Sequence, residues 1–194
     1  MPIPLWFQLA WTAFVLYVLA VWWRHYGWRN YLWFSDLALI GSVPALWLGS
    51  AALASVLAVT VLLPELLWNL DFALRLLSRR RLTPLTDYMF ERERPLLLRA
   101  LSLFHMLLPP VLLWLLAAYG YDAAAGLPGA LLLAAIVLPC SRVLGSPAQN
   151  INWAHAFGDR PVRWPAWRYL AVLYAGMVLL VFVPTDLLLR AIAG

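Results

Sequence analysis

The sequence predicts an all-α fold, a polytopic transmembrane helical bundle of about six spans that forms a single domain over residues 1–194. Hydrophobic residues make up 64% of the chain and charged residues make up 12%. A soluble globular domain carries about 25% charged residues, so this composition excludes an ordinary soluble protein. Apolar stretches of about 20 residues alternate with short polar connections, as repeated crossing of a bilayer requires.

Six apolar segments approach or reach the length that crosses a hydrocarbon layer. We expect these spans at residues 4–23, 31–48, 51–76, 96–119, 127–145 and 166–183. Most connections between them are short. Residues 77–95 are the exception, because they mix charges of both signs with large apolar side chains, and this mixture predicts a short interfacial helix between spans three and four.

The arginines predict the orientation of the chain. The sequence has fourteen basic residues, all of them arginine, and thirteen lie in or beside the first, third and fifth connections. The second and fourth connections have none, and Arg190 lies near the C-terminus. Basic residues beside a span are retained in the cytoplasm, so both termini are expected outside. We therefore attribute the net charge of +5 to topology and to anionic lipid headgroups, and expect no nucleic-acid partner.

The third span contains unusual polar residues, Glu65, Asn69 and Asp71. A carboxylate in a membrane helix is by default a candidate functional residue, because burying it in hydrocarbon is unfavourable. At about 100° per residue, Asn69 lies about 40° from Glu65, so the two share one face. Asp71 points about 120° away and precedes Arg75 by four residues, which predicts a structural ion pair between Asp71 and Arg75.

Polar residues of two other spans lie at matching depths. With a rise of 1.5 Å per residue, Glu65 lies about 16 Å and His105 about 14 Å above the cytoplasmic ends of their helices. Pro109 cannot donate to the carbonyl of His105, so a free acceptor is expected beside the imidazole. If spans two, three and four are neighbours, one cavity open to the cytoplasm would be lined by Asp36, Glu65, Asn69, Ser102 and His105.

A paired Glu65 and His105 would stabilise each other's charged form and could relay protons or bind a cation. A metal site is less well supported. The chain has three histidines, and they form neither an HExxH motif nor a pair four residues apart. We therefore expect no metal and leave the cofactor open. The single cysteine, Cys140, excludes a disulfide within the chain.

The fifth connection contains an amide-rich stretch, residues 149–155. One interpretation is a re-entrant or interfacial segment that caps the cavity from the cytoplasm, with Asn150, Asn152 and His155 as ligand contacts. The alternative is a capped surface turn whose aromatic residues dip into lipid. The sequence leaves both interpretations open.

Five motifs carry a resemblance to other proteins: WFSD (33–36), PELLWNLDF (64–72), LTDYMF (85–90), LSLFH (101–105) and NINW (150–153). Through them, most of the chain resembles a group of uncharacterised small bacterial inner-membrane proteins. The spacing of the aspartate span, the histidine span and the asparagine-rich loop is more distantly similar to the YwaF-like integral membrane family. The resemblance implies a location in the bacterial inner membrane and supplies no activity, so no functional residue is carried over.

Three functions fit the sequence. In the first, the cavity binds a small molecule, a lipid headgroup or a cation, with proton-coupled transport, and Glu65 titrates with His105 as its partner. In the second, the chain is an accessory subunit of a larger membrane complex, and its tryptophan-rich and small-residue faces pack against partner helices. In the third, it is a membrane enzyme acting on lipid, with Asp36, Glu65 and His105 in acid–base or metal roles.

Overall fold

Helices make up every regular element of the computed structural model, which describes residues 3–157 and 163–193. The longer helices are α1 (Leu5–Tyr26), α2 (Phe34–Leu48), α3 (Ala51–Ser78), α5 (Phe104–Tyr119) and α6 (Gly126–Leu144). The last traverse consists of α7 (Ala166–Met177), a π-helical segment η4 (Val178–Phe182) and α8 (Val183–Ala193). The short elements are η1 (Trp28–Leu32), η2 (Asp87–Phe90), α4 (Leu96–Leu101) and η3 (Ile151–Trp153). The predicted all-helical class is confirmed.

Five helical stretches are long and apolar enough to cross a membrane, at Leu5–Tyr26, Ala51–Ser78, Leu96–Tyr119, Gly126–Leu144 and Ala166–Ile192. The remaining apolar helix, α2, has 15 residues. It begins later than the sequence predicts because residues 28–32 form the 3₁₀ helix η1 and Trp33 is extended, with φ −60° and ψ 136°. The shorter α2 packs against α1 on one side and α3 on the other.

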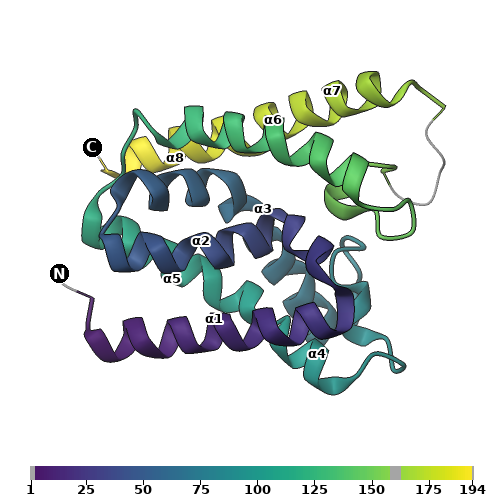
Figure 1. Ribbon diagram of the computed structural model, residues 1–194, viewed down its shortest axis with the longest axis horizontal. Helices are drawn as coiled ribbons and strands as arrows, with labels where there is room; N and C mark the ends of the chain where they lie inside the picture. Colours follow the sequence, from purple (N-terminus) through teal and green to yellow (C-terminus); the bar gives the residue numbers. More distant parts are fainter. Residues whose placement is uncertain (1–2, 158–162, 194) are drawn as a thin grey trace.

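The helices lie side by side with alternating directions, and both termini lie at the same end of the bundle (Figure 1). The central helix is α3, which contacts α2, α5, α6 and the last traverse. The apolar window of α3 is 56% buried, against 22% for α1. Polar side chains on α3 therefore face protein rather than the outside of the bundle.

The connection from α3 to α4 is not the interfacial helix that the sequence predicts. It is a series of turns that contains one short 3₁₀ helix, η2. Helix α3 ends at Ser78, and the next residue, Arg79, has a left-handed φ of 55° that breaks the helix. The buried carboxylate of Asp71 then accepts the backbone N–H groups of Leu82 and Thr83, both at 2.8 Å, and the hydroxyl of Thr86. These bonds fold the connection back onto α3 and leave no continuous helix.

A polar clasp closes the end of the bundle that carries the termini. The hydroxyl of Tyr121 donates to the carboxylate of Asp186 on α8. Arg190, one turn further along α8, donates to the same carboxylate at 2.8 Å and to the carbonyl of Ala123 at 2.7 Å. The clasp therefore joins the connection before α6 to the last helix.

Candidate functional site

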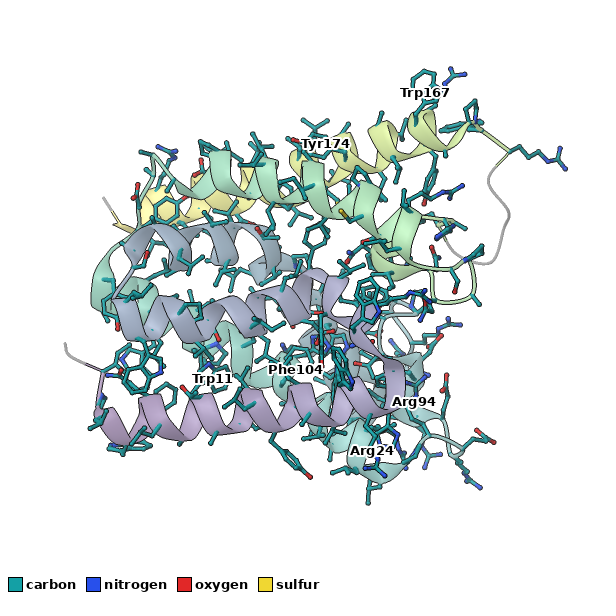
Figure 2. All side chains as sticks on the ribbon, viewed as in Figure 1. Trp11, Arg24, Arg94, Phe104, Trp167 and Tyr174 are labelled. Atoms are coloured by element: carbon teal, nitrogen blue, oxygen red, sulfur yellow. The ribbon has the colours of Figure 1, made fainter. Side chains whose placement is uncertain are left out.

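A cavity of about 680 Å³ lies among α1, α2, α3 and α5, at the end of the bundle opposite the termini. Its lining includes side chains from all three arginine-rich connections, among them Asn30, Arg94 and Gln149. Figure 2 shows Phe104, another lining residue, in the interior and Arg94 towards that end. The cavity therefore extends from the middle of the bundle to its arginine-rich end.

Glu65 and His105 form a buried pair in the wall of this cavity. The imidazole Nδ1 of His105 lies 2.8 Å from Oε2 of Glu65, and Glu65 is 3% exposed. The rings of Trp68 and Phe104 stack on the imidazole, with centroid distances of 4.7 and 4.1 Å. The stacking fixes the plane of the imidazole, and the distance of 2.8 Å places the two groups within hydrogen-bond reach.

Asn69 positions this pair and does not line the cavity itself. Its side-chain amide donates to the carbonyl oxygens of Glu65 and His105, each at 2.8 Å. The carbonyl of His105 is the acceptor that Pro109 leaves without a helical donor. Asn69 therefore satisfies a freed carbonyl inside the bundle and ties α3 to α5 beside the pair.

Asp36 also lines the cavity, from the first turn of α2, and is 3% exposed. Its Oδ2 accepts a hydrogen bond of 2.8 Å from the side-chain amide of Asn30. Its Oδ1 is buried and has no hydrogen-bond partner among the described residues. A buried carboxyl oxygen without a partner is unfavourable, so this atom is the place in the wall that most requires a proton, a water or a ligand.

Ser102 and Tyr88 complete the polar wall. Ser102 lies at the break between α4 and α5, and its hydroxyl donates to the carbonyl of Leu98 at 3.0 Å. Tyr88, from η2, accepts the indole N–H of Trp68 at 3.2 Å. Burial raises the pKa of the Tyr88 phenol, which keeps the group neutral at physiological pH. Sequence reasoning missed Tyr88 because its charged surroundings indicated the headgroup layer.

Residues 149–155 form part of the cavity wall, but of the three residues that the sequence predicts there, Asn152 alone lines the cavity. Gln149, Ile151, Asn152 and Trp153 line the cavity, whereas Asn150 and His155 do not. The side chain of Asn150 instead closes the loop: its Oδ1 accepts the backbone N–H groups of His155 and Ala156, at 2.9 and 3.1 Å. Asn150 therefore uses its polar atoms within the loop, and its role as a ligand contact stays a prediction.

Asn152 joins three parts of the chain. Its Oδ1 accepts the backbone N–H of Phe34, which begins α2, at 3.1 Å. Its amide nitrogen donates to the carbonyl of Leu32 at 2.7 Å and to the hydroxyl of Ser141 at 3.0 Å. The polar atoms of Asn152 therefore hold the loop to α2 and α6, although the residue borders the cavity.

His155 lies behind the loop, beside Arg142 of α6. Arg142 donates to the carbonyls of Ala154 and His155 at 3.0 and 3.3 Å. The Nε2 atom of His155 is buried without a partner in the described part of the chain. Burial, together with the positive charge of Arg142, lowers the pKa of His155. His155 is therefore a half-buried loop residue outside the cavity lining, and its role as a ligand contact stays a prediction.

The predicted ion pair between Asp71 and Arg75 is wrong. Asp71 is fully buried and bonds the connection that follows α3. The guanidinium of Arg75 pairs instead with Asp87 and lies 4.6 Å from the centre of the Phe90 ring. Because the connection folds back over the end of α3, it offers each side chain a partner that the helical spacing alone does not reveal.

In residues 3–157 and 163–193, no group of three or more His, Cys, Asp or Glu residues is placed to hold a metal ion. Arg160, one of the arginines used for the predicted orientation, lies outside these ranges. Comparison of the chain with protein-family models, with curated proteins and with solved structures found no match.

Proposed function

We propose that this chain is a multi-pass protein of the bacterial inner membrane whose cavity binds a small ligand from the cytoplasm, with coupled exchange of a proton at Glu65 and His105. The observation that carries this proposal is the carboxylate–imidazole pair, joined at 2.8 Å and buried in the wall of a cavity of about 680 Å³. Ionisable side chains inside membrane helices face such cavities and mark ligand or proton pathways. Cavities of about 300–1,000 Å³ suit small molecules.

The proposed topology has six crossings, made by α1, α2, α3, α4 with α5, α6, and α7 with α8. The direction of the helices supports it, because an even number of crossings returns both termini to one end, as in Figure 1. The 15 residues of α2 span about 22 Å, less than a hydrocarbon layer of about 30 Å. Contacts of α2 with α1, α3 and α5 support its inclusion, since they pack it within the bundle.

Coupling between ligand and proton follows from the charges around the cavity. The titratable groups that line it together with Glu65 and His105 are His25, Tyr26, Asp36, Tyr88 and Arg94. A ligand that enters changes both the charge and the hydration near the pair. Since these two factors set how strongly a buried group holds its proton, binding releases or takes up a proton at the pair.

Thermal unfolding of the purified chain in nanodiscs tests the proposal. A panel of small solutes in four classes, namely amines and quaternary ammonium salts, carboxylates, sugars and phosphates, is added to the wild type and to Glu65→Gln. We expect at least one class to raise the unfolding temperature of the wild type in a pH-dependent manner and to have no such effect on Glu65→Gln. Glu93→Gln is the matched control, because Glu93 is exposed in the connection before α4. If no class stabilises the wild type, the proposal fails.

A further inference from the structure

Two of the ionisable groups beside the cavity already have a side-chain partner. Glu65 is paired with His105 at 2.8 Å. Arg94 lies at the arginine-rich end, and its guanidinium donates to the carboxylate of Glu91 at 3.2 Å. Neither charge is therefore free to attract a ligand of opposite charge without first losing its partner.

Asp36 differs from both. Its carboxyl group is buried, faces the same cavity, and accepts a hydrogen bond from the neutral amide of Asn30 through Oδ2. Its Oδ1 has no hydrogen-bond partner in the described ranges of the chain. A positively charged group in the cavity would satisfy this oxygen and compensate the carboxylate, whereas an anion would be repelled.

Aromatic rings form much of the remaining wall, and they come from α1, the start of α2, α3, η2 and η3. Those that the inference uses are Trp22, Tyr26, Trp33, Trp68, Tyr88 and Trp153. Edge-to-face pairs connect them, between Trp22 and Tyr26 at 5.9 Å and between Trp33 and Trp153 at 6.3 Å. The faces of tryptophan and tyrosine attract cations through the quadrupole of the ring, and such cages recognise quaternary ammonium groups.

We infer that the cavity binds an organic cation, a quaternary ammonium or protonated amine that carries an apolar group, with Asp36 as its counter-ion. The inference rests on the proposed function, since it takes the cavity to be a ligand site. A volume of about 680 Å³ far exceeds that of a bare metal ion. A metal ion also prefers several oxygen ligands, whereas this wall offers one unpaired carboxylate and several rings. The cation can belong to a free solute or to a lipid headgroup such as choline.

Titration of benzyltrimethylammonium into the purified chain in phosphatidylglycerol nanodiscs, followed by calorimetry, tests the inference. We expect the wild type to bind it and Asp36→Asn to bind at least tenfold more weakly. Trp33→Leu should weaken binding by about two- to thirtyfold, as loss of one cation–π contact predicts. The matched control is Asp122→Asn at the opposite end of the bundle, where the new side chain keeps an acceptor for the N–H groups of Ala124 and Ala125. Phenylacetate, with the same ring and the opposite charge, should not bind.

Repeating the titration in phosphatidylcholine nanodiscs distinguishes a lipid headgroup from a free solute as the source of the cation. If a lipid headgroup fills the site, the apparent affinity for benzyltrimethylammonium falls at least tenfold there. An unchanged affinity assigns the site to a free solute, and either result supports the inference.

Equal affinity of Asp36→Asn and the wild type would overturn the inference, as would binding of phenylacetate. Circular dichroism shows whether Asp36→Asn folds, and if it does not, Trp33→Leu and phenylacetate decide the outcome. If a sugar or an anion stabilises the wild type and benzyltrimethylammonium does not bind, the ligand is not an organic cation. That result would overturn this inference but would still agree with the proposed function. If no solute binds or stabilises the wild type, both the inference and the proposed function are overturned.

Discussion

The side-chain amide of Asn69 donates to the carbonyl oxygen of His105 at 2.8 Å, and this carbonyl is the one that Pro109 leaves without a helical partner. The bond joins α3 to α5 beside the pair of Glu65 and His105. This hydrogen bond between two helices takes the place of the bond that a non-proline residue at position 109 would donate within α5. The side chain of Asn69 therefore helps to position the imidazole.

Replacement of Asn69 by Ala should destabilise the protein by about 1–3 kcal/mol, because the carbonyl of His105 then lies buried without a donor. Pro109→Ala restores a backbone N–H at the position that can bond this carbonyl. We therefore expect Asn69→Ala to lower the unfolding temperature less in the Pro109→Ala background than in the wild type. Thermal unfolding of the wild type, the two single variants and the double variant in nanodiscs measures the coupling between the two substitutions. Strictly additive changes in stability would contradict the proposal that a backbone N–H at position 109 can replace the Asn69 amide as donor.

Glu65→Gln should abolish ligand binding, or its dependence on pH, and leave a folded protein that can still be extracted. Glutamine keeps the shape of the side chain and a hydrogen-bond acceptor for His105, but it cannot exchange a proton. The release or uptake of protons on ligand binding, measured in weakly buffered solution, should vanish in Glu65→Gln and persist in Glu93→Gln. Wild-type proton exchange in Glu65→Gln would exclude Glu65 as the titrating group.

Asp71→Ala should release the connection between α3 and α4. This carboxylate accepts two backbone N–H groups and the hydroxyl of Thr86, and charged hydrogen bonds of this kind are worth about 1.5–3 kcal/mol each. We expect trypsin to cleave at the exposed Arg79, Arg80 and Arg81 at least tenfold faster in Asp71→Ala. Asp71→Asn should be intermediate, since its carbonyl oxygen still accepts the two N–H groups.

The matched control for this cleavage is Asp122→Ala, whose aspartate bonds backbone N–H groups at the other end of the bundle. Cleavage after residues 79–81 should remain at the wild-type rate in that variant. A rate that is unchanged in Asp71→Ala would show that other contacts hold the connection in place.

His155 should titrate below the ordinary histidine pKa of about 6.5. Burial and the nearby Arg142 both disfavour its charged form. As the pH falls through the ordinary range, the unfolded chain takes up a proton that the folded chain resists, so stability rises with pH there and is lost on acidification. The imidazole C2 proton signal, assigned by its absence in His155→Gln, gives the pKa by NMR. A value at or above the ordinary one would contradict the burial of this ring.

Cysteine labelling tests the proposed topology. The single natural cysteine is first replaced by Cys140→Ser, and a new one is then placed in the connection before α6 by Ala124→Cys or after α3 by Arg80→Cys. On intact cells, an impermeant maleimide should label Ala124→Cys and should label Arg80→Cys only after permeabilisation. The reverse pattern would invert the orientation and place the cavity mouth outside the cell.

The pair of Glu65 and His105 was predictable because three regular features of helices coincide. Helical periodicity placed Glu65 and Asn69 on one face, the rise per residue placed Glu65 and His105 at one depth, and Pro109 freed a carbonyl beside the imidazole. The contacts of α3 with α2 and α5 then brought these faces together. None of these features depends on the conformation of a connection.

The structure differs from the sequence-based expectations where a connection folds back on the bundle. The spacing of Asp71 and Arg75 satisfies the rule for ion pairs within a helix, but the turns after α3 offer both residues other partners. Asn150 is used in a loop where its φ of 41° is left-handed, a conformation that asparagine tolerates and that no periodic pattern reveals. Tyr88 likewise reaches the cavity only because its connection folds inwards.

The π-helical segment η4 sets the rotational phase of the final helix. A π-turn accommodates one residue more than an α-helical turn, and each residue rotates a helix by about 100°. A regular α-helix through the same residues, Val178–Phe182, would turn Asp186 away from Tyr121. The widened turn thus acts as a spacer, since it allows the last crossing to pack along α3 and still present its aspartate to the tyrosine that closes the far end.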